Sequence, residues 1–371
     1  MDIDRYLSKI YYNPASPASF SGAHKIWSYV KLRKDRPTRL TYKKIVSWLD
    51  QQDTHTIHRI PRKIFPREKI IVEGIDEQWD ADLLSVADLA TYNDGYTQLF
   101  VAIDLFSRYL WVRPLKNKSA KSTAAALKDI FATGRKCTTL RVDRGAEFTG
   151  KFITRLLAEE NVHCIQAYNE FKASYAERAN RLIQDKLYKY FYENQTFKYI
   201  DILQDVVQSY NSTPHGTTGV APKDVNQANE YSLYEKIYIP ILDKRARESV
   251  KYAFEVGQAV RVSFQRKPFQ RGYKEHYSEE IFKVNARVPS HPPRYKLVDL
   301  RGEEILGSFY KEELIPVSYS ESDDFKVEKI VGYKTVGRKR YAIIRWYGYS
   351  PNFDSLVPAQ EVKKYSSQKG H

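Results

Sequence analysis

The chain has 371 residues, 42% of them hydrophobic, with 60 lysines and arginines against 45 aspartates and glutamates, a formal net charge of +15. This length predicts several domains, each with enough apolar residues for a packed core. The positive charge favours a polyanionic partner, and nucleic acid is the leading candidate. The two cysteines support no disulfide framework, and no apolar run is long enough to span a membrane, so we expect a soluble intracellular protein.

The first predicted elements form a small basic helical module. Helices are predicted over 23–32 and 41–52, and in the second one Ile45, Trp48 and Leu49 share a face. Residues 59–67 are basic and contain two prolines, which predicts an extended linker. The chain's 29 tyrosines could stack on bases, which strengthens the case for nucleic acid.

Strand patterns begin after residue 75. The first two predicted strands are separated by Asn93-Asp94-Gly95, a strong hairpin signal. The predicted order is strands over 79–90, 96–105 and 108–115, a helix over 119–132, a strand over 138–142, a helix over 151–160, a strand over 162–167, and a long helical region from 174 toward 210. This order predicts an α/β fold of the ribonuclease H type, in which the first strand lies near the end of the fourth.

Short strands return in the last third of the chain. After a helical stretch to about residue 242, strands are predicted over 259–265, 279–288, 294–300 and 304–310. Regular short strands with glycine and proline between them are typical of a small barrel. The acidic run 321–324 then predicts a boundary before a final unit that extends to His371.

Three acids occur in contexts that suit a metal site. Asp82 lies on the first predicted strand, Asp143 at the end of the fourth, and Glu177 in the long helix. Mg²⁺ prefers oxygen ligands, and two such ions can activate an attacking oxygen and stabilise a leaving one. The residues alone do not choose between Asp80 and Asp82, which share a strand face together with Asp88. Each acid also has an ordinary interpretation, as a solvated strand face, a turn residue that caps a helix, or a surface ion pair.

The order and context of these acids carry a resemblance. Residues 74–225 resemble the retroviral-type integrase core of the DDE transferases, through Trp79, Asp82, the hairpin 101–108, Asp143-Arg-Gly-Ala-Glu-Phe148 and Glu177-Arg-Ala-Asn-Arg181. The tryptophan three residues before Asp82 selects it over Asp80. The spacing between Asp143 and Glu177 is slightly shorter than in retroviral enzymes.

Nearly the whole chain is similar to the integrase of Maverick/Polinton-type transposons. The shared pattern includes Tyr12-Asn-Pro14, the run 75–82, Asn93-Asp-Gly-Tyr96, and Tyr210-Asn211 followed by His215. The zinc-binding His-His-Cys-Cys module of retroviral integrases has no counterpart, since no cysteine precedes Cys137.

This resemblance implies a DNA integrase, a polynucleotidyl transferase that processes 3′ ends of element DNA and joins them to target DNA. It further implies that Asp82, Asp143 and Glu177 are the catalytic ligands of two Mg²⁺ or Mn²⁺ ions, with Asp82 shared between both. No covalent protein intermediate is needed, because metals and positioning supply the stabilisation. The implied partners are element-end and target DNA and further copies of the chain, and the implied location is the nucleus.

Several residues are candidate DNA contacts. Arg178, Asn180 and Arg181 flank Glu177 on its helix, and Lys172 precedes it. Their alternative interpretation is solvated charge with pairing inside the helix. Residues 256–314 resemble the SH3-like barrel that follows the core in these integrases, and there the candidates are Arg261, Arg266 and Lys267. Phosphate contacts of this kind add affinity without sequence information.

The last unit resembles a chromodomain, through the segments 325–330, 341–349 and 354–358. On this match Phe325, Trp346 and Tyr349 form a cage for a methylated ammonium group, held by cation-π interaction. A methylated histone tail is then a further partner. The alternative is that the three rings are core residues of a chromodomain-like fold that contacts DNA or protein. Leu356 departs from the tryptophan usual at that position.

We therefore expect four parts: a helical DNA-binding module and linker over 1–73, a ribonuclease H-like catalytic core over 74–240, an SH3-like barrel over 241–320 and a chromodomain-like unit over 321–371. A rival function is that of a catalytically inactive, domesticated integrase that acts as a chromatin adaptor. A third is a nuclease that cuts DNA without joining it.

Overall fold

The structure is a computed structural model of the chain, and it describes residues 2–62, 64–167, 174–264, 275–319 and 325–366. The chain forms two compact units, one over Lys69–Ser249 and one that combines Met1–Glu68 with Val250–His371. The four-part division expected from the sequence stays a prediction. In the described ranges, no helix is both long and apolar enough to cross a membrane.

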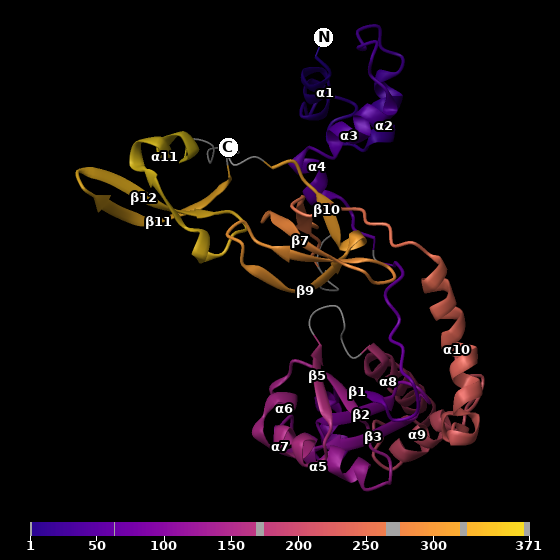
Figure 1. Ribbon diagram of the computed structural model, residues 1–371. Coiled ribbons are helices and arrows are strands. Elements are labelled where there is room, and N and C mark those ends of the chain that lie inside the picture. Colours follow the sequence, from indigo (N-terminus) through magenta and orange to yellow (C-terminus); the bar gives the residue numbers. More distant parts are fainter. Residues whose placement is uncertain (1, 63, 168–173, 265–274, 320–324, 367–371) are drawn as a thin grey trace. The chain divides into compact units, whose positions relative to one another are not determined.

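A five-stranded mixed sheet lies at the centre of the Lys69–Ser249 unit (Figure 1). Its strands, in spatial order, are β3 (Leu110–Leu115), β2 (Gln98–Asp104), β1 (Gln78–Ser85), β4 (Thr139–Asp143) and β5 (His163–Ala167). The pairs β3-β2 and β2-β1 are antiparallel, whereas β1-β4 and β4-β5 are parallel. This is the ribonuclease H-like arrangement predicted from the order of elements.

Helices cover both faces of this sheet (Figure 1). One face packs against α5 (Ala120–Phe131) and α7 (Lys151–Glu159), with the short α6 (Ala146–Thr149) before α7. The other packs against α8 (Ser174–Asn194) and α9 (Leu203–Asn211). Because side chains alternate along a strand, Trp79 and Ala81 of β1 join the first core, while Asp80 and Asp82 face α8.

Two predicted boundaries in this unit are wrong. The first strand ends at Ser85 and is followed by the 3₁₀ helix η1 (Ala87–Tyr92), so Asp88 is exposed off the strand. The long helix is interrupted between α8 and α9. There the Asn93 side chain accepts the backbone N–H groups of Tyr199 and Ile200, at 2.6 and 3.1 Å, and donates to the carbonyl of Phe197. These bonds satisfy a non-helical backbone, which local helical propensity alone does not predict.

After α9 come η2 (Pro222–Asp224) and the 21-residue helix α10 (Gln227–Arg247). Asn226 caps α10, because its side chain accepts the N–H of Ala228 and its own N–H is bound by Asn229. The helical stretch predicted here is confirmed.

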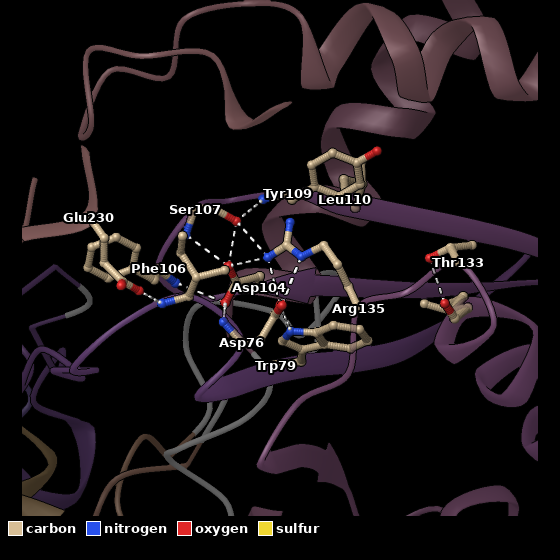
Figure 2. Close-up of polar contacts among 12 residues, drawn as sticks. Asp76, Trp79, Asp104, Phe106, Ser107, Tyr109, Leu110, Thr133, Arg135 and Glu230 are labelled. Carbon is tan, nitrogen blue, oxygen red and sulfur yellow. Dashed lines mark hydrogen bonds and ion pairs between the residues drawn. The ribbon is translucent and has the colours of Figure 1, made fainter. Parts of the chain in front are cut away.

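A polar network fixes the entrance to the core sheet (Figure 2). Arg135 lies 2.6 Å from Asp76 and 2.9 Å from Asp104, and Trp79 donates its indole N–H to Asp76 at 2.8 Å. Asp104 is fully buried, and burial raises its pKa while Ser107 and Arg135 oppose that rise. The network therefore ties together the chain before β1, the end of β2 and the loop before β4.

Four helices begin the other unit: α1 (Ile3–Tyr11), α2 (Ala23–Val30), α3 (Tyr42–Leu49) and α4 (Asp53–His58). The first three share a core that contains Ile45, Trp48 and Leu49, as the sequence predicts. Trp48 also donates its indole N–H to Asp4 of α1, at 2.6 Å. The helices α2 and α3 were expected, whereas α1 and α4 were not.

Two antiparallel sheets complete this unit. The first has the order β10 (Leu314–Pro316), β6 (Ala259–Val262), β7 (Phe282–Val288), β8 (Arg294–Val298) and β9 (Glu304–Tyr310), with η3 (Lys311–Glu313) before β10. The second contains β11 (Val327–Val336), β12 (Lys339–Trp346) and β13 (Ser355–Pro358), with η4 (Pro351–Phe353) before β13 and α11 (Ala359–Ser366) after it. The four predicted strands between 259 and 310 are confirmed, and β10 is a fifth.

Candidate active site

Asp82 and Asp143 are neighbours on adjacent strands. Ala81 of β1 pairs with Val142 of β4 in a parallel ladder, so Asp82 and Asp143 are the next residues along the two strands. Residues at the same level of neighbouring strands project from the same face of a sheet. The topology therefore brings these two acids to one face of the sheet, the one that α8 covers.

Glu177 comes from α8, in the first turn of that helix. Ala176, Ala179 and Ile183 are buried against the sheet, whereas Glu177 is exposed at the margin of that contact. Three residues farther along, Asn180 donates its side-chain amide to Asp82 at 2.8 Å. The helix that carries Glu177 is thus bonded to the strand that carries Asp82.

The carboxylate of Asp82 is close enough to Asp143 and Glu177 for their charges to affect its pKa. Burial raises its pKa, and the negative charges of Asp143 and Glu177 raise it further. The backbone N–H of Leu83, which donates to its carboxylate at 2.8 Å, and the positive charge of Lys118 act in the opposite direction. Like charges gathered around a half-buried carboxylate favour binding of a cation there.

No group of three or more histidine, cysteine, aspartate or glutamate side chains in the described part of the chain lies close enough together to hold a metal ion. Asp82, Asp143 and Glu177 thus interact electrostatically without forming a closed cluster of ligands. Their donor atoms are carboxylate oxygens, the kind that Mg²⁺ and Mn²⁺ prefer.

Lys118 is a residue of this site that the sequence interpretation missed. Its ammonium lies 3.1 Å from a carboxylate oxygen of Glu147, and its side chain is 55% exposed. The Glu147 carboxylate is buried over Gly145, where an added Cβ would collide with it. The sequence shows that Lys118 follows the third predicted strand. Its proximity to Asp82, however, becomes visible only in the folded chain.

Asp80 differs sharply from Asp82. It is fully buried, one of its oxygens accepts the backbone N–H of Tyr175 at 3.1 Å, and burial raises its pKa to about 6. Nearby Arg141 and Arg108 oppose this rise. Asp80 is therefore enclosed, whereas Asp82 is only half-buried, and the choice of Asp82 as a metal ligand stays a prediction.

The predicted DNA contacts on α8 have different environments. Arg178 and Arg181 are exposed. Asn180 is only 7% exposed and its amide is bound to Asp82, so a role in holding that carboxylate replaces the predicted phosphate contact. Lys172 lies outside the described residues.

Arg261 also departs from its predicted role. It is 3% exposed and forms ion pairs with Asp53 at 3.0 Å and Glu279 at 3.5 Å, because β6 directs it into the interior. A guanidinium enclosed by two carboxylates is not available to a phosphate, so its role is structural. Arg266, Lys267 and the acidic run 321–324 lie outside the described residues.

The three aromatic residues predicted to form a cage lie together. The ring of Phe325 is 6.0 Å from that of Trp346 and 5.5 Å from that of Tyr349, between centroids. Trp346 donates its indole N–H to Ser355 at 2.8 Å, and the Tyr349 hydroxyl accepts the backbone N–H of Ile281 at 3.3 Å. Binding of a methylated ammonium group stays a prediction.

Comparison with known proteins gives two kinds of match in sequence. Residues 75–175 match the family described as the integrase core domain. A transposon-derived protein of Caenorhabditis elegans is 34% identical over 204 residues, which cover 54% of this chain and 68% of the relative. The Pol polyprotein of Radiation murine leukemia virus (strain Kaplan) is 29% identical over 136 residues, which cover 35% of this chain and 23% of the polyprotein.

Solved structures of low similarity also match. The HTLV-2 integrase catalytic core domain in complex with magnesium is 16% identical with a TM-score of 0.35, over 40% of this chain and 95% of that one. The simian T-cell lymphotropic virus intasome in complex with the PP2A regulatory subunit B56 gamma is 14% identical with a TM-score of 0.46, over 80% of this chain and 96% of that one.

Proposed function

We propose, from the premise that the chain belongs to the family of transposon-derived proteins with an integrase core domain, that it is a DNA integrase. It would process the 3′ ends of element DNA and join them to target DNA. The observation that carries this proposal is the arrangement of three elements: β1 and β4 bring Asp82 and Asp143 to one face of the sheet, and α8, which carries Glu177, is bonded to Asp82.

Asp82, Asp143 and Glu177 are the residues that would hold two divalent cations, Mg²⁺ or Mn²⁺. Their carboxylate oxygens fit such ions, and a bound cation would relieve the repulsion among the three acids. When bound, the ions supply activation of the attacking oxygen and stabilisation of the leaving one. Asn180 and the N–H of Leu83 fix the orientation of the Asp82 carboxylate from two sides.

The other residues of the site would position DNA. Lys118 carries its ammonium beside the acids, where it can hold a phosphate oxygen of the strand being cut or joined. The exposure of Arg178 and Arg181 supports a contact with the DNA backbone, and Lys172, Arg266 and Lys267 remain candidates for the same role. Positioning of this kind lets a water molecule cut the element end, and then lets the freed 3′ hydroxyl attack target DNA in line.

Asp143→Asn tests the catalytic assignment. We expect Mg²⁺-dependent joining of element-end oligonucleotides to a plasmid to be lost, because the amide cannot replace a charged ligand, while binding of the same oligonucleotides persists. Asp88→Asn is the matched control, since Asp88 is an exposed acid on η1. If Asp143→Asn joined DNA at a rate near that of the unchanged chain, the catalytic role of Asp143 would be wrong. If the unchanged chain cut DNA without joining it, the nuclease function would be favoured.

A chromatin-reading function is a second candidate, supported by the contact of Phe325 with the rings of Trp346 and Tyr349. It would act in the nucleus, either alongside integration or, in a domesticated protein, in place of it. We expect a trimethyl-lysine histone peptide to bind the full chain more tightly than its unmethylated form, and Trp346→Ala to abolish that preference. Equal binding of both peptides would contradict the cage. The proposal of a DNA integrase also includes the assembly of several copies of the chain on a pair of element ends.

A further inference from the structure

Asp80 is buried, but it is bonded to the same helix as Asp82 of the proposed site. It lies two residues before Asp82 on the same face of β1, and both acids are bonded to α8. We propose that Asp80 is a positioning residue, which together with Asp82 clamps α8 to β1 at two points and thereby sets the place of Glu177.

The two contacts are matched in spacing. The backbone N–H of Tyr175 donates to Asp80 at 3.1 Å, and the side chain of Asn180 donates to Asp82 at 2.8 Å. Two residues of strand span about 7 Å, and five residues of helix rise by about 7.5 Å. Both bonds can therefore form when the first turns of α8 run along β1 in the direction of that strand. Glu177 lies between the two helical partners, Tyr175 and Asn180.

A second group holds the same point of the helix. The guanidinium of Arg108 lies 4.3 Å from the ring centroid of Tyr175, and Arg108 is 4% exposed. Its charge also stabilises the ionised form of Asp80 against burial. Tyr175 is thus bound through its backbone by Asp80 and through its ring by Arg108. A negative side chain at the amino end of a helix is favourable for the helix dipole as well.

The clamp gives a reason for the presence of Asp80 near the start of α8, although burial of a carboxylate is energetically unfavourable. Glu177 is exposed in the first turn of α8, so its place relative to Asp82 depends on how that turn is held. Loss of the contact at Tyr175 would leave Asn180 as the one side-chain bond described here between α8 and β1. The proposal rests on the proposed function insofar as Glu177 is taken as a cation ligand.

The test compares Asp80→Ala with Asp80→Asn in the full chain, with Asp88→Ala as the control for loss of an exposed acid. The asparagine side chain retains an oxygen that can accept the N–H of Tyr175, whereas alanine retains none. Three quantities are measured: hydrogen exchange at the Tyr175 amide, the affinity for Mn²⁺, and the Mg²⁺ concentration for half-maximal joining. Circular dichroism and thermal unfolding check that each variant is folded.

For Asp80→Ala we expect exchange at Tyr175 to accelerate by at least tenfold, and Mn²⁺ affinity to fall by roughly 10- to 100-fold, as is usual when a residue that orients a metal ligand is lost. Asp80→Asn should stay within about threefold of the unchanged chain for exchange, since it keeps the hydrogen bond. Unchanged exchange and Mn²⁺ affinity in Asp80→Ala would overturn the clamp. If the unchanged chain joins no DNA, the proposed function fails, and hydrogen exchange still decides the clamp.

Tyr175→Pro serves if Asp80→Ala does not fold. Tyr175 lies in the first turn of α8, where an N–H has no partner within the helix and proline removes no helical hydrogen bond, so this change removes the donor and the ring beside Arg108 while Asp80 stays. We expect Mn²⁺ affinity to fall at least tenfold while the helix content is retained. Unchanged affinity in this variant would also overturn the proposal.

Discussion

Lys118 brings a positive charge close to Asp82, and its position is set by its ion pair with Glu147. Glu147, to which it is paired, is 8% exposed and packs over Gly145 in the turn that follows Asp143. Glu147 therefore anchors the ammonium, and the exposed part of the Lys118 side chain faces the solvent where DNA would bind. This position brings the positive charge of Lys118 close enough to Asp82 to oppose the rise in the pKa of that carboxylate.

Lys118→Gln should lower the rate of joining by roughly tenfold, because a charge-assisted contact to phosphate is replaced by a neutral one. The measurement is the rate of strand transfer at saturating Mg²⁺ and limiting DNA. Lys121→Gln is the matched control, as Lys121 is an exposed residue at the start of α5. Equal rates for the two variants would contradict a contact between Lys118 and DNA.

His215 is held in its neutral form by two features. The backbone N–H of Thr217 donates to its Nδ1 at 3.1 Å, which requires an unprotonated nitrogen. Burial, together with the charge of Arg108, lowers the pKa of His215 below its usual value of 6.5. The folded chain therefore binds a proton at His215 less readily than the unfolded chain does.

This difference predicts a pH dependence of stability. Between the lowered pKa of the folded state and about 6.5, the unfolded chain binds more protons, so the free energy of unfolding falls as the pH is lowered through that window. His215→Asn, whose side-chain oxygen can accept the same N–H, should remove this contribution. Urea unfolding of both proteins between pH 5 and pH 8 measures it. A difference between them that is constant across that range would exclude His215 as the cause.

At the scale of elements, the network around Arg135 joins three segments that enter or leave the core sheet. Because Asp104 is fully buried, removing Arg135 would take away the cation paired with its charge and leave it with hydrogen bonds such as that from the N–H of Ser107. The guanidinium also packs over the rings of Tyr109 and Trp111, at 5.1 and 5.0 Å. This one side chain therefore combines ion pairing with packing at the entrance of β1.

Arg135→Ala should reduce the free energy of unfolding by about 3 kcal/mol, as expected for breaking a largely buried ion pair. Arg113→Ala is the control. Arg113 pairs with Asp129, whose side chain is 62% exposed, and surface pairs contribute about 1 kcal/mol or less. Denaturant unfolding of the two variants compares them, and equal losses would show that burial of Asp104 does not matter.

The elements of the core were largely predictable because their signals are local. The turn at Asn93 is an example: Asp94 and Gly95 adopt positive φ angles, and Tyr96 donates its N–H back to Asn93, although η1 separates this turn from β1. The break after Asn194 was not predictable, since it depends on Asn93, which is remote in sequence.

The candidate site shows the same division. Its three acids were identified from their neighbours in sequence, and their catalytic role is still a prediction. The burial of Asp80 and Arg261 and the approach of Lys118 depend on contacts between distant segments, which periodicity and composition do not contain.

At the scale of the whole molecule, the excess of positive charge predicts strong salt dependence of DNA binding. If six or more phosphates are contacted, affinity should fall by roughly 1,000-fold or more between 50 and 200 mM salt. The double variant Arg178→Gln/Arg181→Gln should make the slope of log affinity against log salt shallower by about two. Lys128→Gln/Lys189→Gln, which changes exposed lysines of α5 and α8, is the control, and an equal slope in both double variants would contradict the assignment of the arginines.

The unit that combines Met1–Glu68 with Val250–His371 has a consequence for synthesis on the ribosome. Asp53 and the carbonyl of Ile57 in α4 are bound by Arg261 and by the N–H groups of His276 and Tyr277, all more than 200 positions later. At roughly 5–20 residues per second, those partners emerge about 10–40 s after α4. The Lys69–Ser249 unit can fold during that interval, whereas α4 has to wait for Arg261, His276 and Tyr277. A nascent chain that stalls after residue 249 would therefore carry a complete core beside an unfinished neighbour.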